Sequence, residues 1–321
     1  MDREAEALVQ LALETLSCSQ KELAVRLGVS PTQISKWKNG DDMSSEMEDK
    51  IRAMVNIGDK SPSFVVWVGS LEAANKWEKL IHLLAEAADE SAETGYDAVP
   101  LRDELDTLCW QTFDALRNMG VGLPKTFPSE LDMDYEEEDS EDLWNMIHGN
   151  PYSSLIWKIY ESFTKVYGFY AAYIQELISD DELDLEDSIV DNIDSCLLEL
   201  AASKLDIEEV QDLATQFREF RYRVKRDYEK WLNHIKDRAL RAGVPLKAEL
   251  LHMVYGSDEA LGEEAEKEGL GFNSSRLHPD IYMDELLRGM RLIHQVLPAI
   301  MKKLGIGIDE FTLDESELRI K

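Results

Sequence analysis

The sequence predicts an all-α protein, with a small N-terminal domain followed by a larger, acidic helical region. The chain of 321 residues contains only 9 prolines and 17 glycines, which favours helices over an architecture rich in turns. Apolar residues recur at helical spacings through most of the chain, as they do over residues 4–16. Hydrophobic residues make up 44% of the sequence, which is enough for substantial cores, and the length allows two or three domains.

The charge of the chain is strongly negative and unevenly distributed. The formal net charge is −31, of which residues 1–58 contribute −3 and residues 59–321 contribute −28. A surface with so many carboxylates repels nucleic acids and anionic membranes at long range. Contact with DNA therefore requires a local basic face, and the segment 17–40 carries a charge of +3.

The cysteines and the N-terminal residues indicate the compartment. Cys18, Cys109 and Cys196 are far apart and form no CxxC pair, so we expect no disulfide framework, no zinc site and a reducing environment. The first ten residues, MDREAEALVQ, include acidic residues and lack the apolar core of a signal peptide. No run of about 18 apolar residues occurs, so we expect a cytoplasmic protein without a membrane span.

Local signals divide the N-terminal segment into short helices. Ser19 and Glu22 have the spacing of a capping box, and Gly28 is suited to end the helix that they begin. Ser30 is a good N-cap, and Pro31 then occupies the first helical position, where its missing N–H costs nothing. The predicted helices span residues 4–16, 20–27, 31–39 and 45–55.

Seven positions of this segment have the residue types that two helices crossing at a tight turn require. Ala24 is small where the second helix passes over the first, and Gly28 makes the turn. The complete set is Leu23, Ala24, Leu27, Gly28, Val29, Ile34 and Trp37. This pattern resembles the helix-turn-helix of the Cro/C1 repressor family, often called Xre-like, over residues 5–56. The resemblance implies a small helical domain that binds double-stranded DNA.

The resemblance also indicates which side chains would contact DNA. The second helix of such a module enters the major groove, so Thr32, Gln33 and Lys36 are expected to read bases. Gln pairs with adenine, Lys donates to guanine, and Thr offers its hydroxyl or its methyl group. The residues expected on the DNA backbone are Gln20, Lys21, Ser30, Lys38 and Asn39. Pro31 stands where some members of the family have a base-reading Gln, so the operator sequence does not follow from these residues.

The predicted domain order is a helix-turn-helix domain over residues 1–56, a linker over 57–63 and an acidic all-helical region over 64–321. The linker is suggested by clustered Gly, Pro and Ser, and the helical region allows a division near the densely acidic loop 129–142. Our first hypothesis is a sequence-specific, repressor-like transcriptional regulator that binds DNA as a dimer. The helical region would mediate oligomerisation or sense a ligand or a protein.

Two alternatives remain open at this stage. The module is followed by the acidic segment GDDMSSEMED, so it could serve as a docking or dimerisation domain instead of binding DNA. The whole protein could also be an interaction protein, similar to an antitoxin or to a phage or defence protein. In that case the acidic bundle would bind a basic nucleic-acid enzyme.

A second basic face is predicted in the segment 217–241, which holds nine basic and four acidic residues. Arg218, Arg221 and Lys225 could bind nucleic acid, a phosphorylated ligand or an acidic partner. The favoured interpretation is that the basic residues pair with acids of the same bundle while the apolar residues pack inward. Those apolar residues are Phe217, Phe220, Val224, Tyr228, Trp231 and Ile235.

The remaining signals are weaker. The aromatic run Trp157, Tyr160, Phe163, Tyr167, Tyr170 and Tyr173 is expected to be core or a homodimer interface more than a ligand pocket. Residues 257–280 are expected to be mostly loop, and a last helix is expected over 281–304, with an interruption near Pro298. His278 and Asp280 lie two residues apart in this expected loop, which is only weak evidence for a metal site or a general base. No motif for a catalytic site, a metal or a cofactor occurs, so we expect no enzyme.

Overall fold

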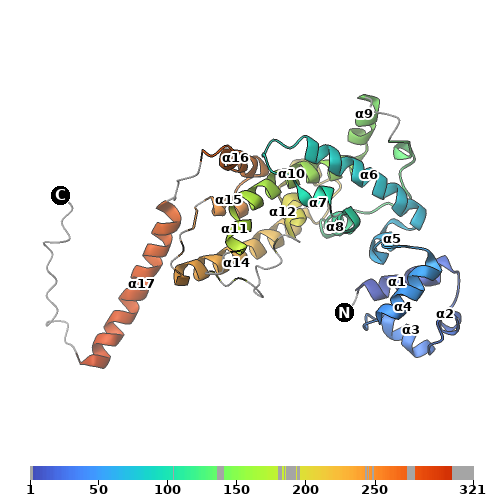
Figure 1. Ribbon diagram of the computed structural model, residues 1–321, viewed down its shortest axis with the longest axis horizontal. Coiled ribbons are helices and arrows are strands. Elements are labelled where there is room, and N and C mark those ends of the chain that lie inside the picture. The colour runs from blue at the N-terminus through green and yellow to red at the C-terminus, as the bar shows by residue number, and fades with distance from the viewer. Residues whose placement is uncertain are drawn as a thin grey trace.

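A computed structural model describes most of the chain, and it is built from helices (Figure 1). The described residues are 3–103, 105–135, 141–179, 183, 185, 193, 196–242, 244, 246, 247, 249–272 and 279–305. Within them there are seventeen α-helices, one short 3-10 helix and no β-strand, and a single isolated bridge joins Val121 to Ala214. The prediction of an all-α fold is therefore confirmed.

Helix α1 is the centre of the N-terminal domain, where it packs against the next helices of the chain. The helices are α1 (Arg3–Thr15), α2 (Gln20–Leu27), α3 (Pro31–Lys38), α4 (Ser45–Val55) and α5 (Pro62–Val68). Helix α1 contacts each of the other four, and the first four helices match their predicted ranges to within one residue. The expected core of the module is largely confirmed, since Val29 is half-buried against it and these side chains are buried: Leu23, Ala24, Leu27, Ile34 and Trp37.

The segment expected to be a linker, residues 57–63, lies against the N-terminal domain. Ile57 is buried, and α5 begins within the segment. Ser61 caps α5 by accepting a hydrogen bond from the N–H of Phe64 at 3.3 Å, and its hydroxyl also lies 3.2 Å from a carboxylate oxygen of Glu4 on α1. The buried apolar side chains of this segment, such as Ile57, belong to one hydrophobic core that extends from the N-terminal domain into the larger region.

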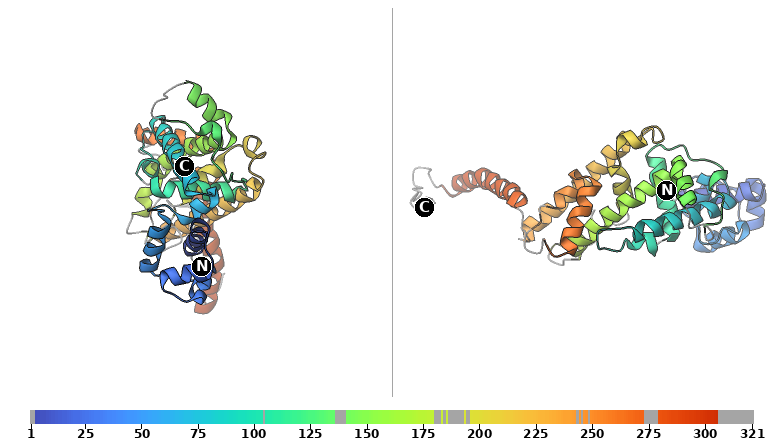
Figure 2. Two further views of the ribbon diagram at one scale, coloured as in Figure 1. Left: turned by 90° about the vertical axis from the view of Figure 1, so that its right-hand side faces the viewer. Right: turned by 90° about the horizontal axis from the view of Figure 1, so that it is seen from above.

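Helix α10 is the centre of the larger helical region. It and its neighbours are α6 (Leu71–Glu90), α8 (Leu105–Asn118), α10 (Pro151–Tyr173), α12 (Leu197–Lys204), α14 (Phe217–Ala242) and α16 (Asp258–Gly269). Helices α6, α12 and α16 pack directly along α10, while α8 and α14 pack against α12. Two further views of this arrangement are given in Figure 2.

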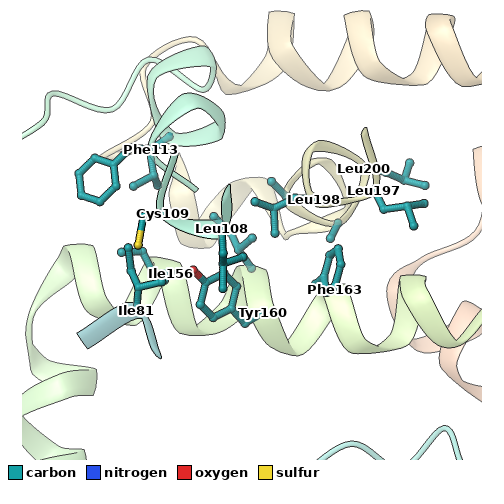
Figure 3. Close-up of a cluster of buried hydrophobic side chains, with 14 of the residues drawn as sticks. Ile81, Leu108, Cys109, Phe113, Ile156, Tyr160, Phe163, Leu197, Leu198 and Leu200 are labelled. Atoms are coloured by element: carbon teal, nitrogen blue, oxygen red, sulfur yellow. The ribbon is translucent and has the colours of Figure 1, made fainter. Parts of the chain in front are cut away.

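The contact of α10 with α8 and α12 is apolar and includes a few buried hydrogen bonds. The side chains that meet there include Leu108, Cys109, Phe113, Ile156, Tyr160, Phe163, Leu197, Leu198 and Leu200 (Figure 3). The hydroxyls of Tyr160 and Thr112 are hydrogen-bonded at 2.6 Å, and burial raises the pKa of Tyr160 well above its usual value. The hydroxyl of Ser162 donates to the carbonyl of Ala201 at 3.0 Å, which joins α10 to α12.

The aromatic residues of α10 and α14 belong largely to the core, as the favoured interpretation predicts. On α10, Tyr160, Phe163, Tyr170 and Tyr173 are buried, and Trp157 and Tyr167 are half-buried. On α14, Leu232 and Ala239 are buried together with all six predicted residues: Phe217, Phe220, Val224, Tyr228, Trp231 and Ile235. Burial of these eight side chains along α14 fixes the orientation of this helix and therefore leaves its basic residues on the opposite face.

Shorter helices connect these elements. They are α7 (Val99–Arg102), η1 (Ser129–Leu131), α9 (Glu141–Gly149), α11 (Gln175–Ile178), α13 (Ile207–Val210) and α15 (Leu250–Tyr255). The predicted acidic loop 129–142 lies partly outside the described residues, and its described ends belong to η1 and to the start of α9.

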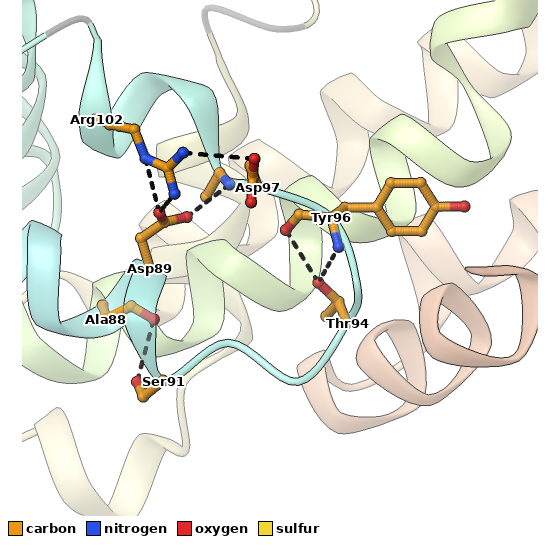
Figure 4. Close-up of polar contacts among 8 residues, drawn as sticks. Ala88, Asp89, Ser91, Thr94, Tyr96, Asp97 and Arg102 are labelled. Carbon is orange, nitrogen blue, oxygen red and sulfur yellow. Dashed lines mark hydrogen bonds and ion pairs between the residues drawn. The ribbon is translucent and has the colours of Figure 1, made fainter. Parts of the chain in front are cut away.

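The connection between α6 and α7 is held by Asp89 (Figure 4). Its carboxylate accepts a hydrogen bond from the N–H of Ala98 at 2.7 Å and pairs with the guanidinium of Arg102, which raises the pKa of the arginine. Thr94 in the same loop packs on α10 at Gly168, where a Cβ would lie 2.7 Å from the threonine side chain. The absence of a side chain at this glycine therefore allows the loop to contact the central helix.

The prediction that residues 257–280 are mostly loop is wrong for the first half of that range, which forms α16. Ser257 caps the helix, and Leu261 is buried where α16 packs along α10. Gly262 lies close to Lys165, since a Cβ would be 3.1 Å from the lysine Cγ. This glycine therefore favours close packing of two helices instead of ending one of them.

Helix α17 (Pro279–Leu304) extends away from the rest of the protein (Figure 1). Among the described residues, no other helix packs extensively against it. The expected interruption near Pro298 is absent, because the helix continues through this residue. None of the described helices combines the length and the apolar character needed to cross a lipid bilayer.

The end of α5 provides a test of the junction between the two regions. Gly69 has a φ of +93°, and a Cβ there would lie 2.5 Å from the carbonyl oxygen of Lys125, whereas Gly58 has a φ of +62° with open space around it. We expect Gly69→Ala to lower the free energy of unfolding by about 2 kcal/mol more than Gly58→Ala, because only the first adds a clash to the backbone strain. Urea denaturation followed by circular dichroism measures the difference, and equal losses would contradict this packing role.

Candidate nucleic-acid interface

Helix α2 begins with a complete capping box. The hydroxyl oxygen of Ser19 accepts a hydrogen bond from the N–H of Glu22 at 3.3 Å. The carboxylate of Glu22 in turn accepts from the N–H and from the hydroxyl of Ser19, both at 2.8 Å. These bonds to the charged carboxylate lower its pKa. The capping box fixes the start of α2, where the first N–H groups of the helix have no partner within the helix.

The turn between α2 and α3 depends on Gly28. Its φ is +75°, in the left-handed region, and its N–H donates to the carbonyl of Val25 at 3.2 Å. The N–H of Val29 then donates to the carbonyl of Ala24 at 3.0 Å. From α4, the ammonium of Lys50 donates to the carbonyl of Leu27 at 3.0 Å and holds the end of α2. The turn between the two helices is therefore fixed by the local backbone bonds of Gly28 and Val29, with one further bond from the Lys50 side chain.

Helix α3 presents one face to the core and the other to solvent. Ser30 caps it by accepting from the N–H of Gln33 at 3.2 Å, and Pro31 follows at the first helical position. Ile34 and Trp37 point inward and are only 0% and 4% exposed. The exposed side of α3 carries Thr32, Ser35, Lys36, Lys38 and Asn39.

The residues predicted to read bases lie on this helix, but they are not equally accessible. Thr32 and Lys36 are exposed and lie one turn apart, whereas Gln33 is half-buried at the edge of the exposed face. Ser35 is exposed near the middle of that face and is not among the residues predicted to contact DNA. Its spacing of three residues from Thr32 and four from Asn39 was the signal that could have identified it.

The residues predicted to contact the DNA backbone surround α3. Lys38 and Asn39 are exposed at its C-terminal end, Lys21 is exposed on the first turn of α2, and Gln20 is half-buried beside it. Ser30 already uses its hydroxyl oxygen as the cap acceptor of α3, so its O–H remains as the donor for a phosphate.

The lysines around α3 have no carboxylate partners in the part of the chain that the structure describes. Within the described residues, Lys21, Lys36 and Lys38 form no ion pair with a carboxylate. After residue 56, several described lysines such as Lys79 are also unpaired with described acids, but seven form such a pair: Lys60, Lys76, Lys158, Lys165, Lys230, Lys247 and Lys267. The lysines of α2 and α3 are therefore available for phosphates. Exposed Asp41 and Asp42 after α3 oppose an anion on that side.

The basic residues of the second basic face on α14 fall into two groups, those without an acid partner among the described residues and those paired with acids of the same region. Arg218, Arg221 and Lys225 are exposed at helical spacing on one side, and the ammonium of Lys225 lies 4.9 Å from the ring centre of Tyr255. Three other basic residues pair with acids of the same region: Arg223 with Glu199, and Arg226 and Lys230 with Asp227. The favoured interpretation of internal pairing therefore fits these three residues, but not Arg218 and Arg221.

A cleft of about 580 Å³ lies where α10, α12 and α14 meet the start of α16. Its charged lining is largely paired, with Lys158 bonded to Glu209 at 2.7 Å. Lys204 donates to two backbone carbonyls, and burial together with the nearby charges of Arg221 and Lys225 lowers its pKa to about 8. The cleft thus neutralises its own charges and lacks the apolar lining of most ligand sites.

The structure indicates no metal centre in the part of the chain that it describes. No cluster there brings together three or more His, Cys, Asp or Glu side chains that could hold a metal ion. The predicted pair of His278 and Asp280 is not tested by this observation, since residue 278 lies outside the described residues.

Comparison with known proteins identifies the N-terminal module only. Residues 9–47 match the helix-turn-helix family of the Cro/C1 type, which covers the capping box, the turn and α3. No curated protein and no solved structure matches the chain. The family indicates DNA binding by this module, and the match does not extend into the larger helical region.

The capping box predicts a pH-dependent property of α2. Because the pKa of Glu22 is lowered by its bonds to Ser19, its stabilising contribution is present above the unfolded pKa and is lost as the pH falls through the folded pKa. We expect Ser19→Ala to raise the pKa of Glu22 only part of the way towards its ordinary value, because the backbone N–H bond of residue 19, the larger cause, remains while the hydroxyl bond is lost. NMR titration of the carboxyl carbons measures this change. Ser44→Ala is the matched control, since Ser44 precedes α4 without a side-chain cap bond. An unchanged pKa in Ser19→Ala would refute this assignment.

Proposed function

We propose that the protein is a sequence-specific DNA-binding regulator of transcription that reads its operator with the exposed face of α3. Thr32, Gln33, Ser35 and Lys36 would meet base edges in the major groove, with Gln33 reaching them from the edge of the exposed face. Lys21 and Lys38 would meet phosphates on either side. The larger helical region would bring two modules together or respond to a ligand or a protein partner.

The observation that carries this proposal is the set of lysines without carboxylate partners on α2 and α3. The chain holds 65 acidic and 34 basic residues, so carboxylates are available to pair with most of its cations. Lys21, Lys36 and Lys38 nevertheless stay exposed and unpaired with acids in the described chain. Because unpaired like charges on one small surface repel each other, a polyanion is the natural partner of this arrangement.

The acidity of the rest of the chain is compatible with this function. Residues 59–321 carry a net charge of −28 and would be repelled by DNA at close range. Since the Debye length is about 8 Å at physiological salt, this repulsion acts on the surfaces that approach DNA and much less on the distant α3 face. The charge would therefore favour approach through the N-terminal module and disfavour non-specific contacts.

The first test removes the predicted base contacts. We expect Gln33→Ala/Lys36→Ala to weaken binding to the preferred sequence, selected from random duplexes or from the DNA upstream of its own gene, by roughly 10- to 100-fold. Fluorescence anisotropy with specific and scrambled duplexes measures both affinity and discrimination, and discrimination should decrease. Gln211→Ala/Lys79→Ala changes the same residue types at exposed positions of the larger region and should bind like the wild type. If neither duplex binds the wild type at low salt, the proposed function is wrong.

The second test separates phosphate contacts from base contacts. Each phosphate neutralised by a lysine contributes about −0.9 to the slope of log K against log salt concentration. We expect Lys38→Ala to make this slope less negative by about 1 and to weaken specific and scrambled duplexes by a similar factor. A slope equal to that of the wild type would show that Lys38 does not contact a phosphate.

A further inference from the structure

Helix α17 exposes the largest group of apolar side chains found on any helix in the described part of the chain. Its exposed large apolar residues are Met290, Leu292, Ile293, Val296, Leu297, Ile300 and Leu304. Ile293 is 61% and Leu304 is 68% exposed, although such side chains are normally buried. An exposed apolar surface of this kind, on a helix against which no other described helix packs extensively, indicates an interaction site.

The spacing of these residues identifies the kind of partner. Met290, Ile293, Leu297, Ile300 and Leu304 follow one another at intervals of three, four, three and four residues, and in the sequence the same spacing continues back through Leu286 and Met283, so the pattern spans both halves of the helix. This alternation places them in one narrow seam, which is the pattern that packs against another helix in a coiled coil. Pro298 follows Leu297 by one position and therefore lies on the flank of the seam. Gln295 and Ala299 lie on the opposite, exposed side.

The charge distribution along the helix favours pairing with its own kind in opposite directions. In the sequence, residues 279–288 carry three acids and one arginine, a net charge of −2, whereas residues 289–304 carry an arginine and two lysines and no acid, a net charge of +3. Two antiparallel copies would bring the acidic half of each helix beside the basic half of the other. Two parallel copies would instead place like charges together at both ends.

The charge of the rest of the protein leads to the same orientation. The chain enters α17 from the acidic helical region, so a parallel pair would hold two strongly negative regions side by side. A helix of 26 residues is about 39 Å long, and antiparallel pairing would separate the two regions by most of that length. Screened repulsion falls off over about 8 Å at physiological salt, so this separation matters energetically.

We propose that α17 is a self-association helix that pairs antiparallel with α17 of a second copy of this chain and forms a two-fold symmetric dimer. A two-fold axis between the helices makes each seam complementary to itself, as such an interface requires. The dimer would carry two N-terminal modules. That these modules occupy two half-sites of an operator rests on the proposed function, whereas the pairing of α17 does not.

The test is the mass of the full chain in solution, measured by analytical ultracentrifugation at micromolar concentration. We expect the wild type to sediment as a dimer and Ile293→Asp/Ile300→Asp to sediment as a monomer with unchanged helical content. Gln295→Asp/Ala299→Asp adds the same two negative charges to the opposite face and should remain a dimer. A monomeric wild type, which would mean that the seam meets a lipid surface or another protein, overturns the proposal, as does a dimer that survives the Ile293/Ile300 change.

The orientation has its own test. In a Cys18→Ser/Cys196→Ser background, a cysteine at Met290, near the middle of α17, should form an interchain disulfide under mild oxidation. A cysteine at Leu304 should not, because in the antiparallel pair the two C-terminal ends are far apart. Cross-linking at Leu304 as efficient as at Met290 would overturn the antiparallel arrangement. A dimer that binds no DNA would refute only the proposed function, and a monomer that binds DNA would refute only this inference.

Discussion

The burial of α10 is the constraint on which the larger region depends. Three helices pack along it, so most of its side chains leave water, including several that are polar. The hydroxyl of Ser162 donates to a carbonyl of α12, that of Ser153 to the carbonyl of Ile147 in α9, and that of Thr164 to a carbonyl within α10. Because these small polar residues find acceptors, α10 is surrounded without the free-energy cost of unpaired buried groups. The core then continues through α6 and α5 to α1, so the N-terminal module is attached to a packed body.

The lysines of the helical region and those of α3 have different surroundings. In the helical region, lysines such as Lys158 and Lys165 are bonded to nearby carboxylates and mainly join its helices to one another. Surface pairs of this kind stabilise a protein only slightly, but a lysine that is paired with a carboxylate attracts a polyanion less strongly than an unpaired one. The unpaired Lys36 and Lys38 on α3 therefore have a larger effect than their number suggests. Under the proposed function, the surrounding acidity contributes orientation, since it penalises every approach to DNA except the one through α3.

The N-terminal helices could be predicted from the sequence because their signals are local. Ser19 with Glu22, Gly28, and Ser30 with Pro31 act within one or two turns, and the structure places each as expected. Helix α16 was missed because Gly262 usually argues against a helix, and only the neighbouring α10 explains why a glycine stabilises the packing there. Ile57 was assigned to a linker for a similar reason, since its burial depends on helices distant in sequence. In the candidate site, the half-burial of Gln33 and the central position of Ser35 required the orientation of α3 as well as its existence.

The two surfaces left without partners, on α3 and α17, lie near opposite ends of the chain and of the molecule (Figure 1). A single module can neutralise only a few phosphates, so alone it binds weakly at physiological salt. Under the two proposals, joining two modules through α17 would make the second contact with DNA intramolecular, and affinity would then rise without any new contact to a base. This gain depends on the stiffness of the path from α3 to α17, because a flexible joint dilutes the effective concentration of the second module. The continuous core from α1 to α10 provides stiffness over the first part of that path. Operator affinity would therefore respond to the packing of the helical region even where that region never contacts DNA.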